Sequence, residues 1–216
     1  MCGRFASALP PAETWSCDAW LALMPEWPDG LFKQYNVSPC SQIGVFVEGS
    51  CFAMRWGLVP SWSKDISSKY ATFNARIESI EEKPAFRHAW RKNQKCLIPA
   101  LGYYEWQTEE GAKQPYFVRS NDGLPLVFAG LWDECEFGGE PLKSCSIITT
   151  ESKNGLQQLH DRMPVILSAD AAKHWLATGE DKKLLLNECI TDVKVYKVDK
   201  RVNNSRQEDA TLIQPL

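Results

Sequence analysis

The apolar residues of this chain come in short runs separated by turn-forming residues, and this spacing constrains the fold more than any other feature. Runs of this length are typical of single β-strands. Strands are predicted over 43–47, 51–58, 73–77, 96–99, 103–107, 116–119, 126–132, 146–150 and 193–198. The first two should form a hairpin around Gly49-Ser50. Helices are predicted over 11–24, over 168–175 with Ser168 as the N-cap, and over 182–189.

Many short strands with few helices predict an α+β fold, with a mainly antiparallel β-sheet or barrel-like core and a few flanking helices. The 13 Pro and 13 Gly residues are scattered, and no segment has the composition of a linker. The length of 216 residues suits one or two domains. We therefore expect a single domain over residues 1–216.

Charge and composition exclude several classes of protein. The net charge is −3, so the chain is not a strongly basic nucleic-acid binder. No apolar run approaches the about 18 residues of a membrane span, and no signal peptide is visible, so we expect a cytoplasmic protein with no membrane partner. The eight cysteines include no Cys-x-x-Cys pair. We therefore expect reduced thiols, no metal and no organic cofactor. Nothing in the sequence demands more than a monomer.

Cys2 carries unusual chemistry if Met1 is removed, because the chain then begins with a free amine and a thiol on adjacent carbons. An α-amino group has a pKa of about 7.7–8.0, so part of it is neutral and nucleophilic near pH 7. The amine can condense with an aldehyde to an imine, and the thiol can then close a thiazolidine ring. The thiol alone could instead act as the nucleophile of an amidohydrolase. An ordinary residue at a frayed terminus is the third interpretation.

Three further segments could contribute polar groups to a site. Glu105 lies between aromatic residues in a predicted strand. Burial there would raise the pKa of its carboxyl group, which suits a general acid or base. The alternative is that Glu105 lies on the solvent-exposed face of the strand. His160 lies in a polar connection before an apolar run, where loop residues often reach a site. Strand alternation places Asn74, Arg76 and Glu78 on one face, which either lines a cleft or faces solvent.

Seven motifs together resemble the SOS-response-associated peptidase (SRAP) family of abasic-site-processing proteins. They occur in the family's order and extend over the whole chain. The matching segments are Met1-Cys2-Gly3-Arg4-Phe5, Tyr35-Asn36-Val37-Ser38-Pro39, Arg55-Trp56-Gly57-Leu58-Val59-Pro60, Phe73-Asn74-Ala75-Arg76-Ile77-Glu78, Gly102-Tyr103-Tyr104-Glu105-Trp106, His160-Asp161-Arg162-Met163-Pro164 and Leu212-Ile213-Gln214-Pro215.

The resemblance implies a protein that recognises abasic sites in single-stranded DNA. The Cys2 amine would attack the aldehyde of the opened sugar, and its thiol would close a thiazolidine, which shields the lesion. Glu105 matches the family's acid/base residue. His160 would assist proton transfer, and Asn74 would hold the sugar or the Cys2 backbone. The peptidase of the family name would describe self-removal of Met1 or an activity on other chains.

The resemblance also implies DNA contacts. Arg76 and Arg162 match phosphate-binding residues, and Arg4 would line the same cleft. Pro39 and Trp62 could stack on bases. Some family members have two consecutive tryptophans, which could insert between bases as a wedge. This chain has Trp62 followed by Ser63, which weakens the case for such a wedge here. Because the chain is slightly acidic, DNA affinity should be modest and sensitive to salt.

Two other functions compete with the crosslinking interpretation. A cysteine hydrolase would use Cys2 as nucleophile, His160 as base, and Asn74 or Glu105 to orient the base, on peptide or amide bonds. A passive single-stranded DNA-binding module would need the arginines but not Cys2. Only the crosslinker explains why a cysteine stands at position 2, and an N-terminal extension should abolish it.

Overall fold

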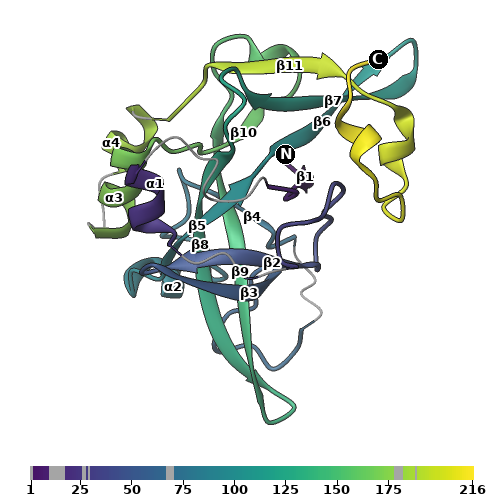
Figure 1. Cartoon of the computed structure of the whole chain (residues 1–216). Coiled ribbons are helices and arrows are strands. Elements are labelled where there is room, and N and C mark those ends of the chain that lie inside the picture. The colour runs from purple at the N-terminus through teal and green to yellow at the C-terminus, as the bar shows by residue number, and fades with distance from the viewer. Residues whose placement is uncertain are drawn as a thin grey trace.

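The computed structural model describes residues 2–9, 18–25, 28, 30–66, 71–177, 182–187 and 189–216. The larger of two sheets contains a barrel, because five strands in the order β9-β3-β2-β5-β8 close when β8 also pairs with β9 (Figure 1). Two short strands, β4 and β10, add to β9. The strands of this sheet are β2 (Gln42–Val47), β3 (Ser50–Trp56), β4 (Asn74–Arg76), β5 (Lys95–Ala100), β8 (Leu126–Phe137), β9 (Glu140–Glu151) and β10 (Arg162–Pro164).

A second, antiparallel sheet lies beside the barrel, with the order β1-β6-β7-β11. Its strands are β1 (Arg4–Ala6), β6 (Gly102–Glu109), β7 (Ala112–Ser120) and β11 (Val193–Lys197). The helices are short, and α1, α3 and α4 lie together at one side of the molecule, at the left of Figure 1. Their bounds are α1 (Asp18–Leu23), α2 (Arg87–Arg91), α3 (Ala169–Ala177) and α4 (Lys182–Asn187), and the 3₁₀ turns are η2 (Leu156–Gln158), η3 (Lys200–Asn203) and η4 (Ala210–Ile213).

The predicted α+β class is confirmed. Each predicted strand has a counterpart, although β8 and β9 extend well beyond the predicted runs and form a long hairpin. The turn between β2 and β3 is Glu48-Gly49, one residue earlier than predicted, and both residues have positive φ, of 48° and 82°. That conformation suits the twist of a two-residue hairpin.

The helix predictions hold in part. Within the predicted helix 11–24, α1 begins at Asp18, and residues 11–17 lie outside the described part of the chain. Ser168 caps α3 as expected, since its hydroxyl accepts a hydrogen bond from Ala171 N at 3.1 Å. The last predicted helix ends at Asn187 rather than at residue 189. The strands β1 and β10 and the helix α2 were not predicted. Among the described residues, no helix is long and apolar enough to span a membrane.

Aromatic packing inside the barrel fixes the first strand. The Phe5 ring lies 5.0 Å from Trp56 and 6.3 Å from Phe128, both edge-to-face. Trp56 is fully buried in the same cluster. Because Phe5 is held in this way, the chain immediately before it, including Cys2, is placed against the barrel.

Candidate functional site

Cys2 lies just before β1 with its side chain fully buried. Its carbonyl oxygen accepts a hydrogen bond of 2.7 Å from Nδ2 of Asn74, the first residue of β4. Asn74 is itself buried, and its Oδ1 has no hydrogen-bond partner among the described residues. Two strands that are far apart in sequence therefore place a cysteine and an oriented carboxamide together.

Glu105 lies in the middle of β6, the strand that pairs with β1. Its side chain is only 3% exposed, and burial raises its pKa to about 7. Burial also raises the pKa of the Cys2 thiol far above its ordinary value, and the negative charge of Glu105 raises it further. The thiol and the carboxyl group are thus close enough to interact. At neutral pH, Glu105 can both donate and accept a proton.

His160 lies between η2 and β10, and burial lowers the pKa of its imidazole. The backbone N–H of Arg162 donates to Nδ1 of His160 at 2.9 Å, which leaves Nε2 as the nitrogen that carries the proton in the neutral ring. Asp161 Oδ1 lies 2.6 Å from the same Nδ1, and the two form an ion pair when the ring is protonated. Asp161 also contributes to the raised pKa of Glu105, so His160 and Glu105 share one neighbour.

Arg76 and Arg162 line one hollow of about 560 Å³, together with Asp161. Arg76 is exposed there. Arg162 is only 7% exposed, and its guanidinium donates to both carboxylate oxygens of Glu78, at 3.0 and 2.8 Å, and to Thr149 O at 2.9 Å. We call this hollow the arginine hollow. Both predicted phosphate-binding residues therefore face one space, but Arg162 is already held in an ion pair.

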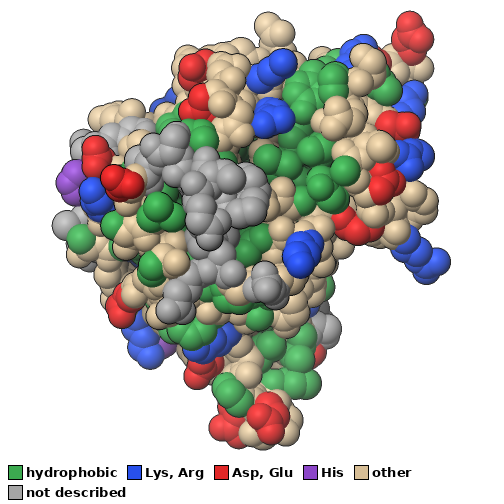
Figure 2. Space-filling view, in the orientation of Figure 1, with side chains coloured by type: hydrophobic (Ala, Val, Ile, Leu, Met, Phe, Trp, Pro, Cys, Tyr) green, Lys and Arg blue, Asp and Glu red, His purple; other side chains and the backbone are tan. Residues whose placement is uncertain are grey.

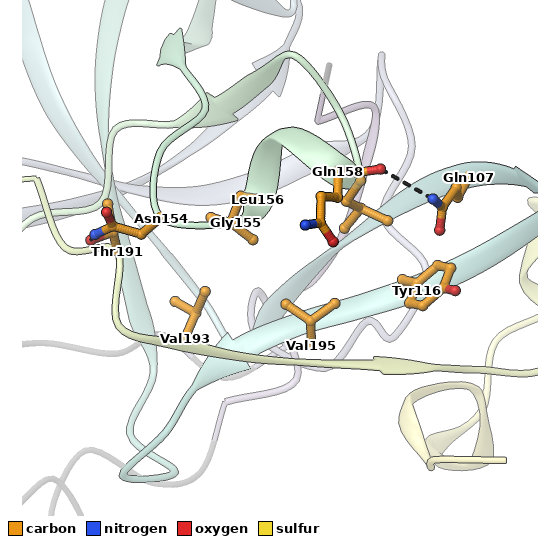
Figure 3. A pocket seen from close by; sticks show the side chains of 10 residues that line it. Gln107, Tyr116, Asn154, Gly155, Leu156, Gln158, Thr191, Val193 and Val195 are labelled. Carbon is orange, nitrogen blue, oxygen red and sulfur yellow. Dashed lines mark hydrogen bonds between the residues drawn. The ribbon is translucent and has the colours of Figure 1, made fainter.

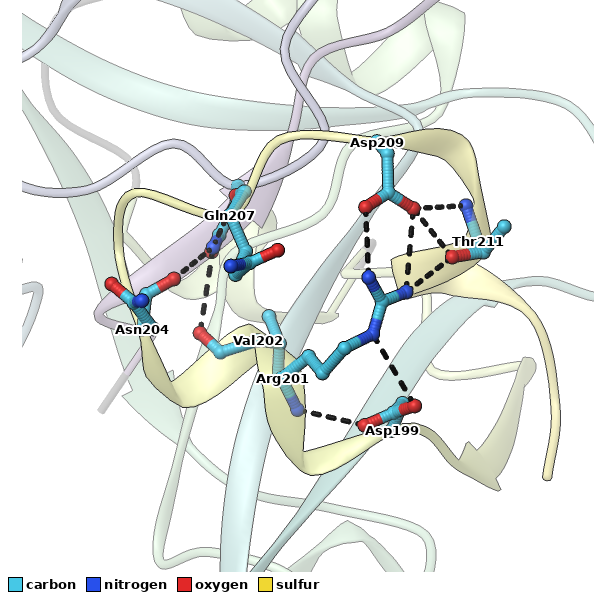
Figure 4. A network of polar contacts seen from close by, with 8 residues as sticks. Asp199, Arg201, Val202, Asn204, Gln207, Asp209 and Thr211 are labelled. Atoms are coloured by element: carbon cyan, nitrogen blue, oxygen red, sulfur yellow. Dashed lines mark hydrogen bonds and ion pairs between the residues drawn. The ribbon is translucent and has the colours of Figure 1, made fainter.

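Arg4 points toward the C-terminal segment, where Nη1 donates to Asn36 Oδ1 at 2.7 Å and to Val202 O at 3.0 Å. Asn36 Nδ2 in turn donates to Asn204 O and Gln207 O, at 3.1 and 2.9 Å. Arg201 holds the same segment closed through Asp199, Asp209 and Thr211 (Figure 4). Arg4 thus ties β1 to the end of the chain, and its contact with DNA stays a prediction.

The two residues predicted to stack on bases differ in exposure. Trp62 is 62% exposed, so its indole is available to a partner, whereas Pro39 is half-buried. The remaining surface gives no single strongly basic face in the view of Figure 2, where acidic and basic side chains are interspersed. Acidic side chains gather at the tip of the β8–β9 hairpin, at the bottom of that view.

Sequence reasoning assigned no role to Asn36 or to Asp161, and placed Glu78 only on a polar face. The partner of Glu78 lies 84 positions away and that of Asn36 lies 32 positions away, so no local pattern could identify either pair. Asn36 and Asp161 do belong to motifs that carry the family resemblance, which was the available signal. Among the described residues, no group of three or more His, Cys, Asp or Glu side chains could hold a metal ion.

Comparison with known proteins shows first the fold and then the family to which the chain belongs. A crystal structure of a protein from Bacteroides thetaiotaomicron is 24% identical, covers all of both chains and superposes with a TM-score of 0.82, which shows the same fold. The family model "SOS response associated peptidase (SRAP)" matches residues 1–205. The chain therefore belongs to the SRAP family.

Curated relatives share a common description. Abasic site processing protein YoaM of Bacillus subtilis is 38% identical, with 87% of each chain covered. Abasic site processing protein HMCES of Xenopus tropicalis is 33% identical and covers 95% of this chain and 76% of the relative.

Proposed function

We propose that this protein recognises abasic sites in single-stranded DNA and bonds to them covalently through Cys2, as a DNA-repair protein. The observation that carries the proposal is a buried Cys2, held by Asn74, next to a carboxyl group with a pKa of about 7. The names of the curated relatives support abasic sites as the substrate. Removal of Met1 must come first, because it frees the Cys2 nitrogen from its amide bond.

The reaction joins an aldehyde and an aminothiol with loss of one water. The neutral Cys2 amine adds to the aldehyde carbon of the opened sugar, and its proton moves to the oxygen to give a carbinolamine. Protonation of that hydroxyl lets it leave as water, and a protonated imine forms. The Cys2 thiol then gives up its proton, its sulfur adds to the imine carbon, and the electron pair of the C=N bond returns to the nitrogen, which keeps its one hydrogen as the thiazolidine ring closes.

We propose a role for each polar group. Glu105 in its acid form donates the proton that expels water, and its carboxylate then accepts the thiol proton. His160, neutral and with its proton on Nε2, can donate to the sugar oxygen as the ring opens. Asn74 fixes the Cys2 backbone and has a buried carbonyl oxygen left to accept from the sugar or amine.

DNA binding is assigned to the arginine hollow. Arg76 offers an exposed guanidinium to a phosphate. Arg162 can do so only in competition with Glu78, so its larger contribution is to hold the start of β10, whose N–H orients His160.

A thiol hydrolase with the same residues is less well supported. A cysteine nucleophile acts as the thiolate and therefore needs a lowered pKa. Burial raises the pKa of the Cys2 thiol instead. An amine that reacts first and a thiol that follows are consistent with this environment. A passive DNA-binding module would leave the buried pair Cys2 and Glu105 without a use.

The test mixes protein that lacks Met1 with a single-stranded oligonucleotide carrying one abasic site, followed by a denaturing gel. We expect a heat-stable shifted band that disappears with Cys2→Ala, with an N-terminal extension and with undamaged DNA. Cys51→Ala, which removes a half-buried thiol in β3, is the matched control and should retain the band. No band from protein lacking Met1 would refute the proposal. Cleavage of peptides without DNA would then favour the hydrolase.

A further inference from the structure

A second hollow, of about 370 Å³, lies next to the segment that leads to His160. It is enclosed between β6, β7 and β11 on one side and the η2 turn on the other (Figure 3). We call it the neutral hollow. The residues used below are Gln107, Tyr116, Asn154, Gln158, Val193 and Val195.

The neutral hollow lies next to the candidate site. Tyr116 is the cross-strand partner of Glu105 in the β6–β7 register, and such partners lie on the same face of a sheet. Gln107 follows Glu105 on that face, about 7 Å further along the strand. On the opposite wall, Leu159 immediately precedes His160. One wall thus continues from Glu105 and the other from His160.

The neutral and arginine hollows lie on the two sides of one ridge, formed by residues 154–161. Gln157 and Asp161 line the arginine hollow, whereas Asn154 and Gln158 line the neutral hollow. The first contains two guanidinium groups and the carboxylates of Glu151 and Asp161, and its exposed Arg76 is the group that can reach a phosphate. The lining residues described for the second include no Lys, Arg, Asp or Glu. Arg76 therefore gives the first a place for phosphate, and the second suits an uncharged group.

The lining of the neutral hollow matches a planar heteroaromatic ring. Val193 and Val195 provide an aliphatic floor, and the Tyr116 ring lies beside them (Figure 3). Carboxamides from Gln107, Asn154 and Gln158 surround them, and Gln107 Nε2 donates to Gln158 O at 3.2 Å. Bases stack on tyrosine, and carboxamides both donate to and accept from base edges. The volume is at the lower end of the about 300–1,000 Å³ of small-molecule sites.

We propose that the neutral hollow receives the base of a nucleotide next to the abasic site. This inference rests on the proposed function, which brings single-stranded DNA to Glu105. The strand would cross the ridge, with phosphates toward Arg76 on one side and a base in the neutral hollow on the other. Gln107 Nε2 and Asn154 Nδ2 already donate to Gln158 O and to Thr191 Oγ1, so these two residues would meet a base through their carboxamide oxygens. Because every base carries an N–H group on its edge that such an oxygen can accept from, the hollow would accept any of the four bases.

The experiment measures non-covalent affinity, so that it does not depend on the crosslink. The DNA carries a tetrahydrofuran spacer, which has no aldehyde, in place of the lesion. One oligonucleotide keeps the neighbouring bases, and a second has spacers at both neighbouring positions too. We expect wild-type protein to bind the second about 5- to 100-fold more weakly, as expected for one lost stacked base.

Val195→Glu places a charge in the hollow from a side chain that is 39% exposed on the edge strand β11, so folding should be retained. We expect this variant to bind base-bearing DNA as weakly as wild type binds the spacer DNA, and to bind both DNAs alike. Lys194→Gln changes the net charge equally on the opposite face of β11 and should keep the wild-type preference. Thermal unfolding of both variants checks the fold.

Equal wild-type affinity for the two DNAs would overturn the inference, and so would a Val195→Glu defect of the same size on both. A Val195→Glu effect on peptide cleavage alone would also overturn it, in favour of a peptide in the hollow. The aldehyde-bearing oligonucleotide separates this inference from the proposed function. If the crosslink forms but the affinity does not depend on the neighbouring bases, only the base site is refuted. If the affinity depends on the neighbouring bases but no crosslink forms, only the covalent chemistry is refuted.

Discussion

Glu105 and the Cys2 amine titrate close together, and the pH dependence of crosslinking should report both groups. Burial raises the pKa of Glu105 to about 7, and a free α-amine has a pKa of about 7.7–8.0. The reaction needs the acid form of the first and the neutral form of the second. We therefore predict a bell-shaped rate profile with its maximum between about pH 7 and 8.

Glu105→Gln should remove the alkaline limb of that profile and lower the maximal rate by about 10²- to 10⁴-fold. Single-turnover crosslinking across a pH series measures both effects. A bell that persists unchanged in Glu105→Gln would show that another group titrates.

The buried Glu105 carboxyl group should lower the free energy of unfolding at alkaline pH. Its folded-state pKa lies above the unfolded value of 4.5, so the folded protein binds the extra proton and loses stability as pH rises from about 4.5 to 7. Glu105→Gln should therefore raise the free energy of unfolding at pH 8 by up to about 3 kcal/mol, with little change at pH 5. Urea unfolding at both pH values measures this. A variant that is destabilised at pH 8 would contradict a buried, ionised carboxylate.

At the scale of the element, the C-terminal segment after β11 holds β1 through Asn36. This side chain is 3% exposed and bridges Arg4 to the carbonyls of Asn204 and Gln207. Asn36→Ala should lower the free energy of unfolding by about 2–4 kcal/mol, because it leaves several buried polar groups without partners. Arg206→Ala, on the exposed part of the same segment, is the control. Equal unfolding midpoints for the two variants would rule out this bridging role.

The elements that sequence reasoning missed are those stabilised mainly by partners distant in sequence. β10 has three residues, one of them proline, and forms because Arg162 pairs with Glu151 across the sheet and its side chain reaches Glu78. β1 also has three residues, and it depends on Val37 and on β6. The longer strands β6 and β7 were predicted because alternation and the Glu110-Gly111 turn are local signals.

At the scale of the whole molecule, DNA affinity must come from few cations, since the net charge is −3. Single-stranded DNA gives a slope of log affinity against log salt of about −0.7 per contacted phosphate, so Arg76 alone predicts about −0.7, because Arg162 is already paired with Glu78. Arg76→Ala should make the slope shallower by about 0.7. Arg91→Ala, at an exposed position at the end of α2, should leave it unchanged. An unchanged slope with Arg76→Ala would place the phosphates elsewhere.

Sequence reasoning anticipated the residue types of the candidate site better than their contacts. Cys2, Asn74 and Glu105 were selected separately, and the two sheets bring them together because β1 pairs with β6 and Asn74 reaches Cys2 from β4, which lies beside the barrel on β9. The ion pair that occupies Arg162 was not anticipated, because it depends on how β4 and β10 both lie along β9. Local patterns therefore selected the candidate residues, whereas strand pairing decides which charges remain available.

Intact mass spectrometry of the crosslinked product tests the central claim most directly. The product of the abasic oligonucleotide and the wild-type protein should have the mass of the chain without Met1 plus the oligonucleotide, minus one water. It should survive borohydride treatment without a mass change, because a closed thiazolidine contains no reducible imine. A product that retains Met1, or one that gains two hydrogens on reduction, would contradict ring closure by the Cys2 amine and thiol.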